Sequence, residues 1–200
     1  GASGSLKGNE VGIKMTATLS IWGARGALPA ADRQFLEYGG NTSCISPDWG
    51  SGVLCFDAGS GLPNLAERLS GTPRLDILIS HVHIDHIPGL YTLSVPLGTE
   101  IHLYGAARQS TSFQQQLETA VGSPYWPVGL RDRSVQVFFH EIVPEDSFSL
   151  PRAGGELRIC TMEGNHPGES LLYRAEFGES SVIYTLDFEM NEEICPASPG

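Results

Sequence analysis

Short apolar runs separated by glycine-containing turns occur along most of the chain. Alternating or continuous apolar runs of this length are typical of β-strands with one or both faces buried. The pattern predicts strands over residues 16–22, 38–47, 53–56, 75–80, 99–105, 134–142, 155–164 and 180–189. Strands therefore dominate both halves of the predicted fold.

Helical periodicity occurs in the first half of the chain. Leu62, Leu65, Ala66 and Leu69 are spaced at i, i+3, i+4 and i+7, and Gly71 ends the pattern. Residues 106–122 are also expected to be helical. Strands with intervening helices, followed by more strands, predict a layered α/β (α+β) sandwich.

The composition is that of a folded protein with a sizeable core. Hydrophobic residues make up 40% of the 200 residues and charged residues 18%, while 24 glycines and 13 prolines suit many short strands and turns. No apolar run approaches the roughly 18–20 residues of a membrane-spanning helix, so we expect no membrane partner and a cytoplasmic location. Four widely spaced cysteines are interpreted as small buried residues and not as a disulfide framework: Cys44, Cys55, Cys160 and Cys195.

The charge balance bears on the choice of partner. Acidic residues outnumber basic residues by 23 to 12, which gives a formal net charge of −11. A protein that binds extended nucleic acid needs a basic surface, so this composition disfavours such a partner. Both lysines, Lys7 and Lys14, precede Met15, and only arginine is used after it. We therefore expect residues 1–14 to be a tag or disordered tail and residues 15–200 to form a single domain.

The segment I-S-H-V-H-I-D-H-I-P-G-L, residues 79–90, concentrates polar side chains directly after a predicted buried strand. His81 and His83 are two positions apart, so an extended segment points them to the same side. Asp85 and His86 follow where Pro88 and Gly89 force a turn. Imidazole nitrogens and carboxylate oxygens are ligands of divalent metals, and three of the six histidines lie in this hexapeptide. The cluster predicts a metal site more strongly than it predicts a chance accumulation in a turn.

Two further candidate ligands follow predicted strands in the second half. His166 lies in a glycine-flanked loop after residues 155–164, and Asp187 follows the apolar run that begins at residue 180. If these strands lie side by side and point the same way, their ends bring the candidate ligands to one edge of the sheets. Either residue alone is equally well explained as structural.

These motifs resemble those of the metallo-β-lactamase superfamily. The resemblance rests on H-V-H-I-D-H at 81–86, G-N-H-P-G at 164–168, T-L-D at 185–187 and D-A-G-S-G at 57–61. The segments W-G-A-R-G-A-L-P and Y-G-G-N-T-S-C further resemble the branch of phosphoribosyl cyclic phosphodiesterases, which is similar to tRNA 3′-end endonucleases. The resemblance covers residues 15–189.

The resemblance implies a four-layer αββα sandwich with two divalent metal ions, zinc being expected ahead of manganese or iron. By motif position one ion would be held by His81, His83 and His166, and the other by Asp85 and His86, with Asp187 bridging them. Asp57 would accept the remaining N–H of a ligand histidine and fix its tautomer. The alternative for Asp57 is an ordinary turn-capping role.

The superfamily ordinarily supplies one more histidine downstream of the bridging aspartate. Here only Glu189, Glu192, Glu193 and Cys195 follow as candidate ligands. Three alternatives remain open: a chain truncated before its last strands, a weakly held second metal, or substitution by another side chain such as His140. His140 and His102 are otherwise interpreted as structural.

The resemblance favours a metal-dependent hydrolase, most simply a phosphodiesterase that attacks a small or cyclic phosphodiester with a metal-activated water. Asp85 would orient or deprotonate that water. Side chains that would contact the substrate are Arg25, Asn41, Tyr125 and Trp126, each with a structural alternative.

Two alternatives to this function are a nuclease of the tRNA-processing kind and a degenerate, non-catalytic metal-binding scaffold. The missing histidine is the support for the scaffold. A truncated domain would also expose apolar sheet surface and favour a homo-oligomer.

Overall fold

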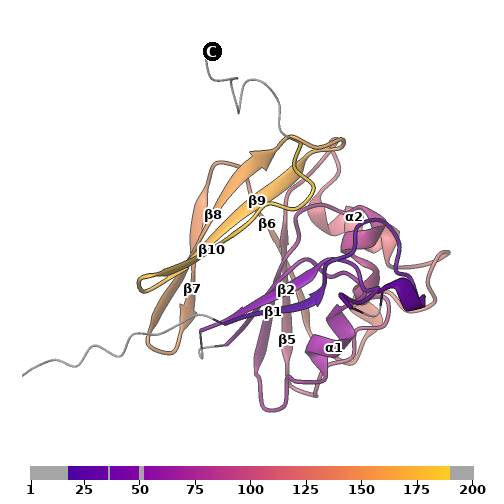
Figure 1. Ribbon diagram of the computed structural model, residues 1–200, viewed down its shortest axis with the longest axis horizontal. Helices are drawn as coiled ribbons and strands as arrows, with labels where there is room; N and C mark the ends of the chain where they lie inside the picture. Colours follow the sequence, from indigo (N-terminus) through magenta and orange to yellow (C-terminus); the bar gives the residue numbers. More distant parts are fainter. Residues whose placement is uncertain (1–17, 36, 50–51, 190–200) are drawn as a thin grey trace, which may run out of the picture.

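The structure is a computed structural model that describes residues 18–35, 37–49 and 52–189. The predicted tag at 1–14 and Cys195 lie outside these residues. Two β-sheets pack face to face, and helices cover the outer face of the larger sheet (Figure 1). The predicted mixed α/β sandwich is therefore confirmed.

The larger sheet has six strands that lie in sequence order. Its strands are β1 (Thr18–Gly23), β2 (Cys44–Asp48), β3 (Val53–Phe56), β4 (Arg74–Leu78), β5 (Glu100–Gly105) and β6 (Val137–Glu141). Strands β1, β2 and β3 pair antiparallel. Strands β3 to β6 are parallel, so their carboxyl ends lie at one edge of the sheet. The histidine motif follows β4 at this edge.

Two short α-helices, α1 (Leu62–Ala66) and α2 (Phe113–Ala120), pack on the outer face of this sheet. The apolar positions predicted for α1 are buried as expected. The prediction for α2 was wrong at its start, because Ser112 caps the helix in a capping box with Gln115. Before the cap, Gln109 and Ser110 have φ of 48° and 61°, so the chain makes a tight turn there.

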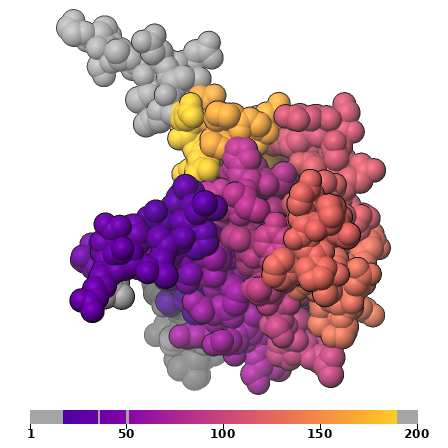
Figure 2. Space-filling model, turned by 90° about the vertical axis from the view of Figure 1, so that its right-hand side faces the viewer, coloured from indigo at the N-terminus to yellow at the C-terminus, as the bar shows by residue number. Residues whose placement is uncertain are grey.

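Single 3₁₀ turns complete the helical elements of the described residues: η1 (Arg33–Phe35), η2 (Ile84–His86), η3 (Pro88–Leu90) and η4 (Leu130–Asp132). Figure 2 looks onto the helical side of the molecule, with the indigo N-terminal segment at one side and the pink and salmon segment at the other. Among the described residues the longest helix has eight residues, and none has the length and apolarity to cross a membrane.

The smaller sheet is an antiparallel meander in the order β10-β9-β8-β7. Its strands are β7 (Ser147–Arg152), β8 (Gly155–Gly164), β9 (Ser170–Phe177) and β10 (Ser180–Tyr184). Strands β7 and β9 were not predicted. Pro151 is tolerated in β7 because an edge strand can leave a backbone position without a donor. Arg174 and Glu176 alternate with buried neighbours in β9, which is the pattern of a strand with one face buried.

The two inner sheet faces share a core that includes several buried aromatic side chains. Phe56 of β3 stacks on Tyr184 of β10 with ring centroids 4.9 Å apart. Each such burial contributes about 1.5–3 kcal/mol, so the sheets are held together mainly by apolar area. No helix of the described residues covers the outer face of the smaller sheet, where Met162 and Ile183 are exposed. The described chain thus contributes three of the four expected layers.

A pair of histidines lies between the sheets, away from the predicted metal ligands. His102 Nδ1 and His140 Nε2 are 2.8 Å apart, so one proton lies between the two rings. Glu100 contacts His102, while Arg74 and Asp76 form an adjacent ion pair. Burial, followed by the charges of His102 and Arg74, lowers the pKa of His140. Both histidines therefore have the structural role that was the preferred interpretation.

This pair is expected to make stability depend on pH. Because the pKa of His140 is lowered on folding, the unfolded chain binds a proton first, and stability falls as the pH drops below about 6.5. Urea unfolding of chelator-treated protein between pH 7.5 and 5.5 would measure the slope. His140→Gln should make that slope shallower, since the amide pairs with His102 without titrating. An unchanged slope in the variant would contradict this assignment.

Candidate metal centre

The histidine motif bends back on itself directly after β4. His83 is extended, and η2 then turns the chain, with the His86 N–H donating to the His83 carbonyl at 3.0 Å. His81 and His83 therefore lie on the same side, and His81 Nε2 is 2.8 Å from His83 Nδ1. Asp85 and His86 are returned toward the same edge, with 3.6 Å between Asp85 Oδ2 and His86 Nε2.

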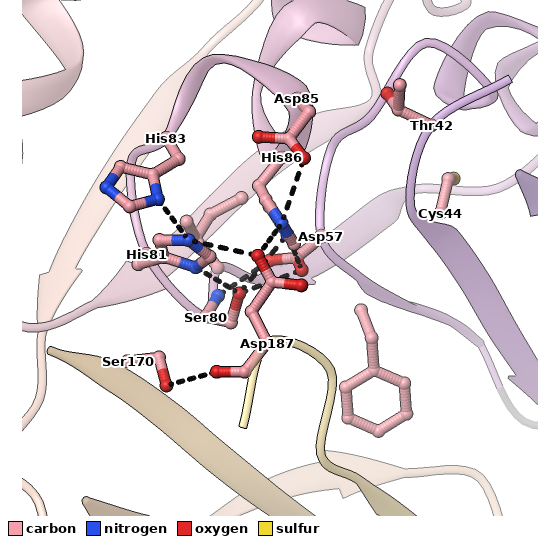
Figure 3. Close-up of polar contacts among 12 residues, drawn as sticks. Thr42, Cys44, Asp57, Ser80, His81, His83, Asp85, His86, Ser170 and Asp187 are labelled. Atoms are coloured by element: carbon pink, nitrogen blue, oxygen red, sulfur yellow. Dashed lines mark hydrogen bonds and ion pairs between the residues drawn. The ribbon is translucent and has the colours of Figure 1, made fainter. Parts of the chain in front are cut away.

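The smaller sheet supplies the other two predicted ligands. His166 lies in the turn between β8 and β9, and its Nε2 is 3.2 Å from His83 Nδ1. Asp187 follows β10, and its Oδ2 is 3.1 Å from His86 Nε2 and 3.7 Å from both His81 Nε2 and His166 Nε2. Figure 3 shows Asp187 pointing from its loop toward the histidine motif. The strands do not lie side by side as supposed, because β9 separates β8 from β10 and β4 belongs to the other sheet.

These side chains form two groups that share one carboxylate. The ligand atoms of the first group, His81, His83, His166 and Asp187, all lie within 4.8 Å of one another, as do those of Asp85, His86 and Asp187. Three converging imidazole nitrogens with a carboxylate oxygen match the donor chemistry of a divalent metal such as zinc. The residues therefore fit the metal ions that the motifs predicted.

Asp57 is fully buried directly after β3, and its carboxylate holds residues of this site by hydrogen bonds. Its carboxylate accepts hydrogen bonds from the Ser80 N–H (2.7 Å), the Ser80 hydroxyl (2.8 Å) and the Tyr184 hydroxyl (2.6 Å). Its Oδ2 is also 2.6 Å from His86 Nδ1. An N–H on Nδ1 directed at Asp57 leaves His86 Nε2 facing Asp187. The predicted contact of Asp57 with a ligand histidine is thus present in the structure.

The turn after Asp57 also holds the backbone of the motif. The Ala58 N–H donates to the His86 carbonyl and the Gly89 N–H donates to the Ala58 carbonyl, both at 2.8 Å. A side chain at Gly89 would bring a Cβ within 2.3 Å of the Gly59 carbonyl oxygen. Glycine at position 89 is therefore required for the two turns to pack this closely.

The electrostatic environment differs between two of the histidines. Burial, followed by the nearby His86, lowers the pKa of His81 to about 3. Burial alone would also lower the pKa of His86, but the charge and hydrogen bond of Asp57, with the charges of Asp85 and Asp187, raise it to about 9. His81 is therefore neutral, so one of its ring nitrogens carries a lone pair, while the carboxylates around His86 favour a positive charge at that point.

The predicted substrate contacts Arg25 and Asn41 lie in loops near the site but are engaged locally. The Arg25 guanidinium donates to the Leu28 carbonyl at 2.8 Å and lies 4.1 Å from the Phe35 ring centroid. Asn41 Oδ1 accepts from the Ser60 hydroxyl. A substrate role for both stays a prediction. The same N-terminal loop does reach the site, because the Ala27 N–H donates to Asp85 Oδ2 at 3.0 Å.

Tyr125 and Trp126 are not brought together with the metal ligands. Tyr125 is 75% exposed, and Trp126 packs on Tyr91 with ring centroids 5.1 Å apart. Neither lines the hollow that includes His81 and His83. Their role in substrate binding stays a prediction, and the packing of Trp126 follows the structural alternative.

Residues that the sequence analysis missed include Ser80, Tyr184 and Arg108. Ser80 and Tyr184 donate hydrogen bonds to Asp57. Their only sequence signal is proximity to candidate ligands, since Ser80 precedes His81 directly and Tyr184 lies three positions before Asp187. Arg108 lies within the predicted helix at 106–122 and carried no sequence pattern. His140 belongs to neither ligand group, so it does not replace the histidine that the resemblance leads one to expect.

The two-sheet architecture, with these ligands at one edge, defines the fold class. The chain has the metallo-β-lactamase fold, as its similarity to solved structures shows. The metallo-β-lactamase fold protein YhfI from Bacillus subtilis aligns with a TM-score of 0.61 and 19% identity, over 88% of this chain and 64% of that protein.

Two further solved structures have the same architecture. A diphosphatase from the PhnP family aligns at TM-score 0.52 and 18% identity, over 83% of this chain and 64% of the other. The short form of human tRNase Z aligns at TM-score 0.54 and 16% identity, over 85% of this chain and 68% of the other. This chain thus spans slightly under two thirds of YhfI and of the diphosphatase. No protein-family model and no curated protein matches the sequence.

Proposed function

We propose that this protein is a metal-dependent hydrolase that cleaves a small or cyclic phosphodiester. The observation that carries the proposal is the shared Asp187 carboxylate, which belongs to both ligand groups at one sheet edge. Carboxylate-bridged pairs of metal ions suit displacement at phosphorus, because both the entering and the leaving oxygen need stabilisation. Support also comes from the solved structures named as a diphosphatase and a tRNase Z.

His81, His83, His166 and Asp187 would hold one ion, and Asp85, His86 and Asp187 the other. When bound, such ions lower the pKa of a coordinated water toward about 7 and polarise a phosphoryl oxygen. Asp85 would accept a proton from the attacking water, and the Ala27 N–H, 3.0 Å from its Oδ2, would keep the carboxylate oriented. Asp57 would hold the His86 ring in one orientation throughout.

The size of the substrate is inferred from charge. A net charge of −11 disfavours the many phosphate contacts of an extended nucleic acid, so a small diester is the better fit. The tRNA-processing nuclease is the alternative within the same chemistry. A non-catalytic scaffold would need the ligand groups to hold metal without turnover.

The test compares metal content with hydrolysis on protein purified without chelator. We expect zinc, manganese or iron to be found by elemental mass spectrometry, and bis(p-nitrophenyl) phosphate to be hydrolysed roughly tenfold or more faster than p-nitrophenyl phosphate, by kcat/KM. Treatment with EDTA should abolish turnover, and zinc or manganese should restore it. Metal uptake without turnover on linear or cyclic diesters would favour the scaffold, and protein that takes up no metal would exclude the hydrolase.

A further inference from the structure

The loop that supplies His166 is flanked by two glutamates that bind the same arginine. Glu163 lies at the end of β8 and Glu169 lies just before β9, on either side of the turn. Arg108 Nη1 donates to Glu163 Oε2 at 3.1 Å and to Glu169 Oε2 at 3.0 Å. Arg108 Nη2 is also 3.0 Å from Glu163 Oε1. One guanidinium therefore joins both ends of the loop.

Arg108 lies in the connection from β5, a strand of the larger sheet, to α2. Its backbone is held in a tight turn, with Arg108 and Thr111 exchanging hydrogen bonds of 3.0 and 2.8 Å. Its side chain is only 13% exposed, whereas those of Glu163 and Glu169 are 39% and 62% exposed. The guanidinium is thus a largely buried group that two more exposed carboxylates contact.

The loop itself has a conformation that needs support. Gly168 and Glu169 have φ of +87° and +66°, and the Glu169 N–H donates to the His166 carbonyl at 2.8 Å. A left-handed conformation is unfavourable for a residue such as Glu169 unless its surroundings hold it. Glu169, the residue with this left-handed conformation, is also the residue that forms an ion pair with Arg108.

Arg108 also lines a hollow of about 420 Å³ that includes His81, His83 and Gly168. In that position it could contact an anionic part of the substrate. The two glutamates neutralise its charge, however, and together leave this group of three side chains net negative. The geometry favours a role in holding the loop over a role in binding a second phosphate.

We infer that Arg108 is a positioning residue that holds the His166 loop against His81 and His83 and thereby strengthens metal binding. This inference rests on the metal site of the proposed function. A ligand must be held within about 0.5 Å of its productive position, and loops achieve this only when a supporting contact fixes them. Loss of such a supporting partner typically weakens metal affinity by about 10–100-fold.

The test measures the zinc dissociation constant by competition with a chromophoric chelator, together with thermal unfolding of the zinc-free protein. Arg108→Met should weaken zinc binding by about 10–100-fold, and Arg108→Lys by less, because an ammonium lacks the fork that reaches both glutamates. The matched control is Arg131→Met, which breaks a solvent-exposed ion pair with Glu118 and should leave zinc affinity unchanged.

The outcomes distinguish failure of the Arg108 role from failure of the proposed metal site. If the wild-type protein binds no zinc, the proposed metal site itself is overturned. Tight wild-type binding with unchanged affinity in Arg108→Met would overturn only the positioning role. If Arg108→Met does not fold, Glu169→Gln removes one arm of the contact at an exposed position, and unchanged zinc affinity in that variant would also overturn the inference.

Discussion

Replacing Asp187 with asparagine is expected to remove metal from both ligand groups and to abolish hydrolysis. Asp187 Oδ2 is within 3.1–3.7 Å of His81, His86 and His166, and it is the one carboxylate that the two groups share. Its φ of 55° is left-handed, a conformation that asparagine adopts readily, so the variant keeps the loop while losing the charge. The loss of metal affinity should exceed the roughly 10–100-fold loss that follows removal of a residue that only hydrogen-bonds to a metal ligand.

Elemental analysis and kcat/KM on the same preparations would check this result. Asp146→Asn is a suitable control, because Asp146 is exposed and uses one oxygen to accept from the Ser147 N–H, which the amide retains. We expect the control to match the wild type in both measurements. Wild-type metal content in Asp187→Asn would show that Asp187 does not bridge the two groups.

The second large effect is expected on stability, from Asp57→Asn. The Asp57 carboxylate is fully buried and accepts three hydrogen bonds while facing His86 at 2.6 Å. Asparagine tolerates the φ of 56° at this position, but its amide group leaves at least one buried donor unpaired and removes the charge opposite His86. Breaking a buried pair in this way costs about 3–5 kcal/mol.

Urea unfolding of the metal-free protein at pH 7.5 would give the difference in the free energy of unfolding. Tyr184→Phe serves as a graded comparison, because it removes only one of the hydrogen bonds and should cost about 1 kcal/mol. Equal stability of Asp57→Asn and the wild type would mean that the network is not what stabilises this edge of the sandwich.

The part of the site that could be predicted from sequence is the part whose geometry is local. His81, His83, Asp85 and His86 lie in one hexapeptide, where the two-residue period of an extended segment and the Pro-Gly turn fix their directions. His166 and Asp187 were predicted from motif resemblance, because their distance from the histidine motif depends on how the two sheets pack. Arg108 could not be found, since its partners lie 55 and 61 positions away and nothing in its own segment marks it.

The same distinction explains the fold. Strands with continuous apolar runs, such as β3 and β4, were predicted from their sequence alone. β9 was missed although the charged residues Arg174 and Glu176 alternate with buried positions, and β7 was missed because proline and serine interrupt its apolar positions. The predicted helix at 106–122 began too early because the turn before Ser112 resembles a polar helical segment until its backbone angles are known.

The origin of the ligands in two different sheets has a consequence for the unfolded chain. His86 and Asp187 are 101 positions apart, so an ion that binds both closes a loop of about half the protein. For a covalent cross-link, a loop of that length removes conformational entropy worth about 4–5 kcal/mol from the denatured ensemble. A metal ion here would act as a reversible clasp, tying the folding of each sheet to that of the other.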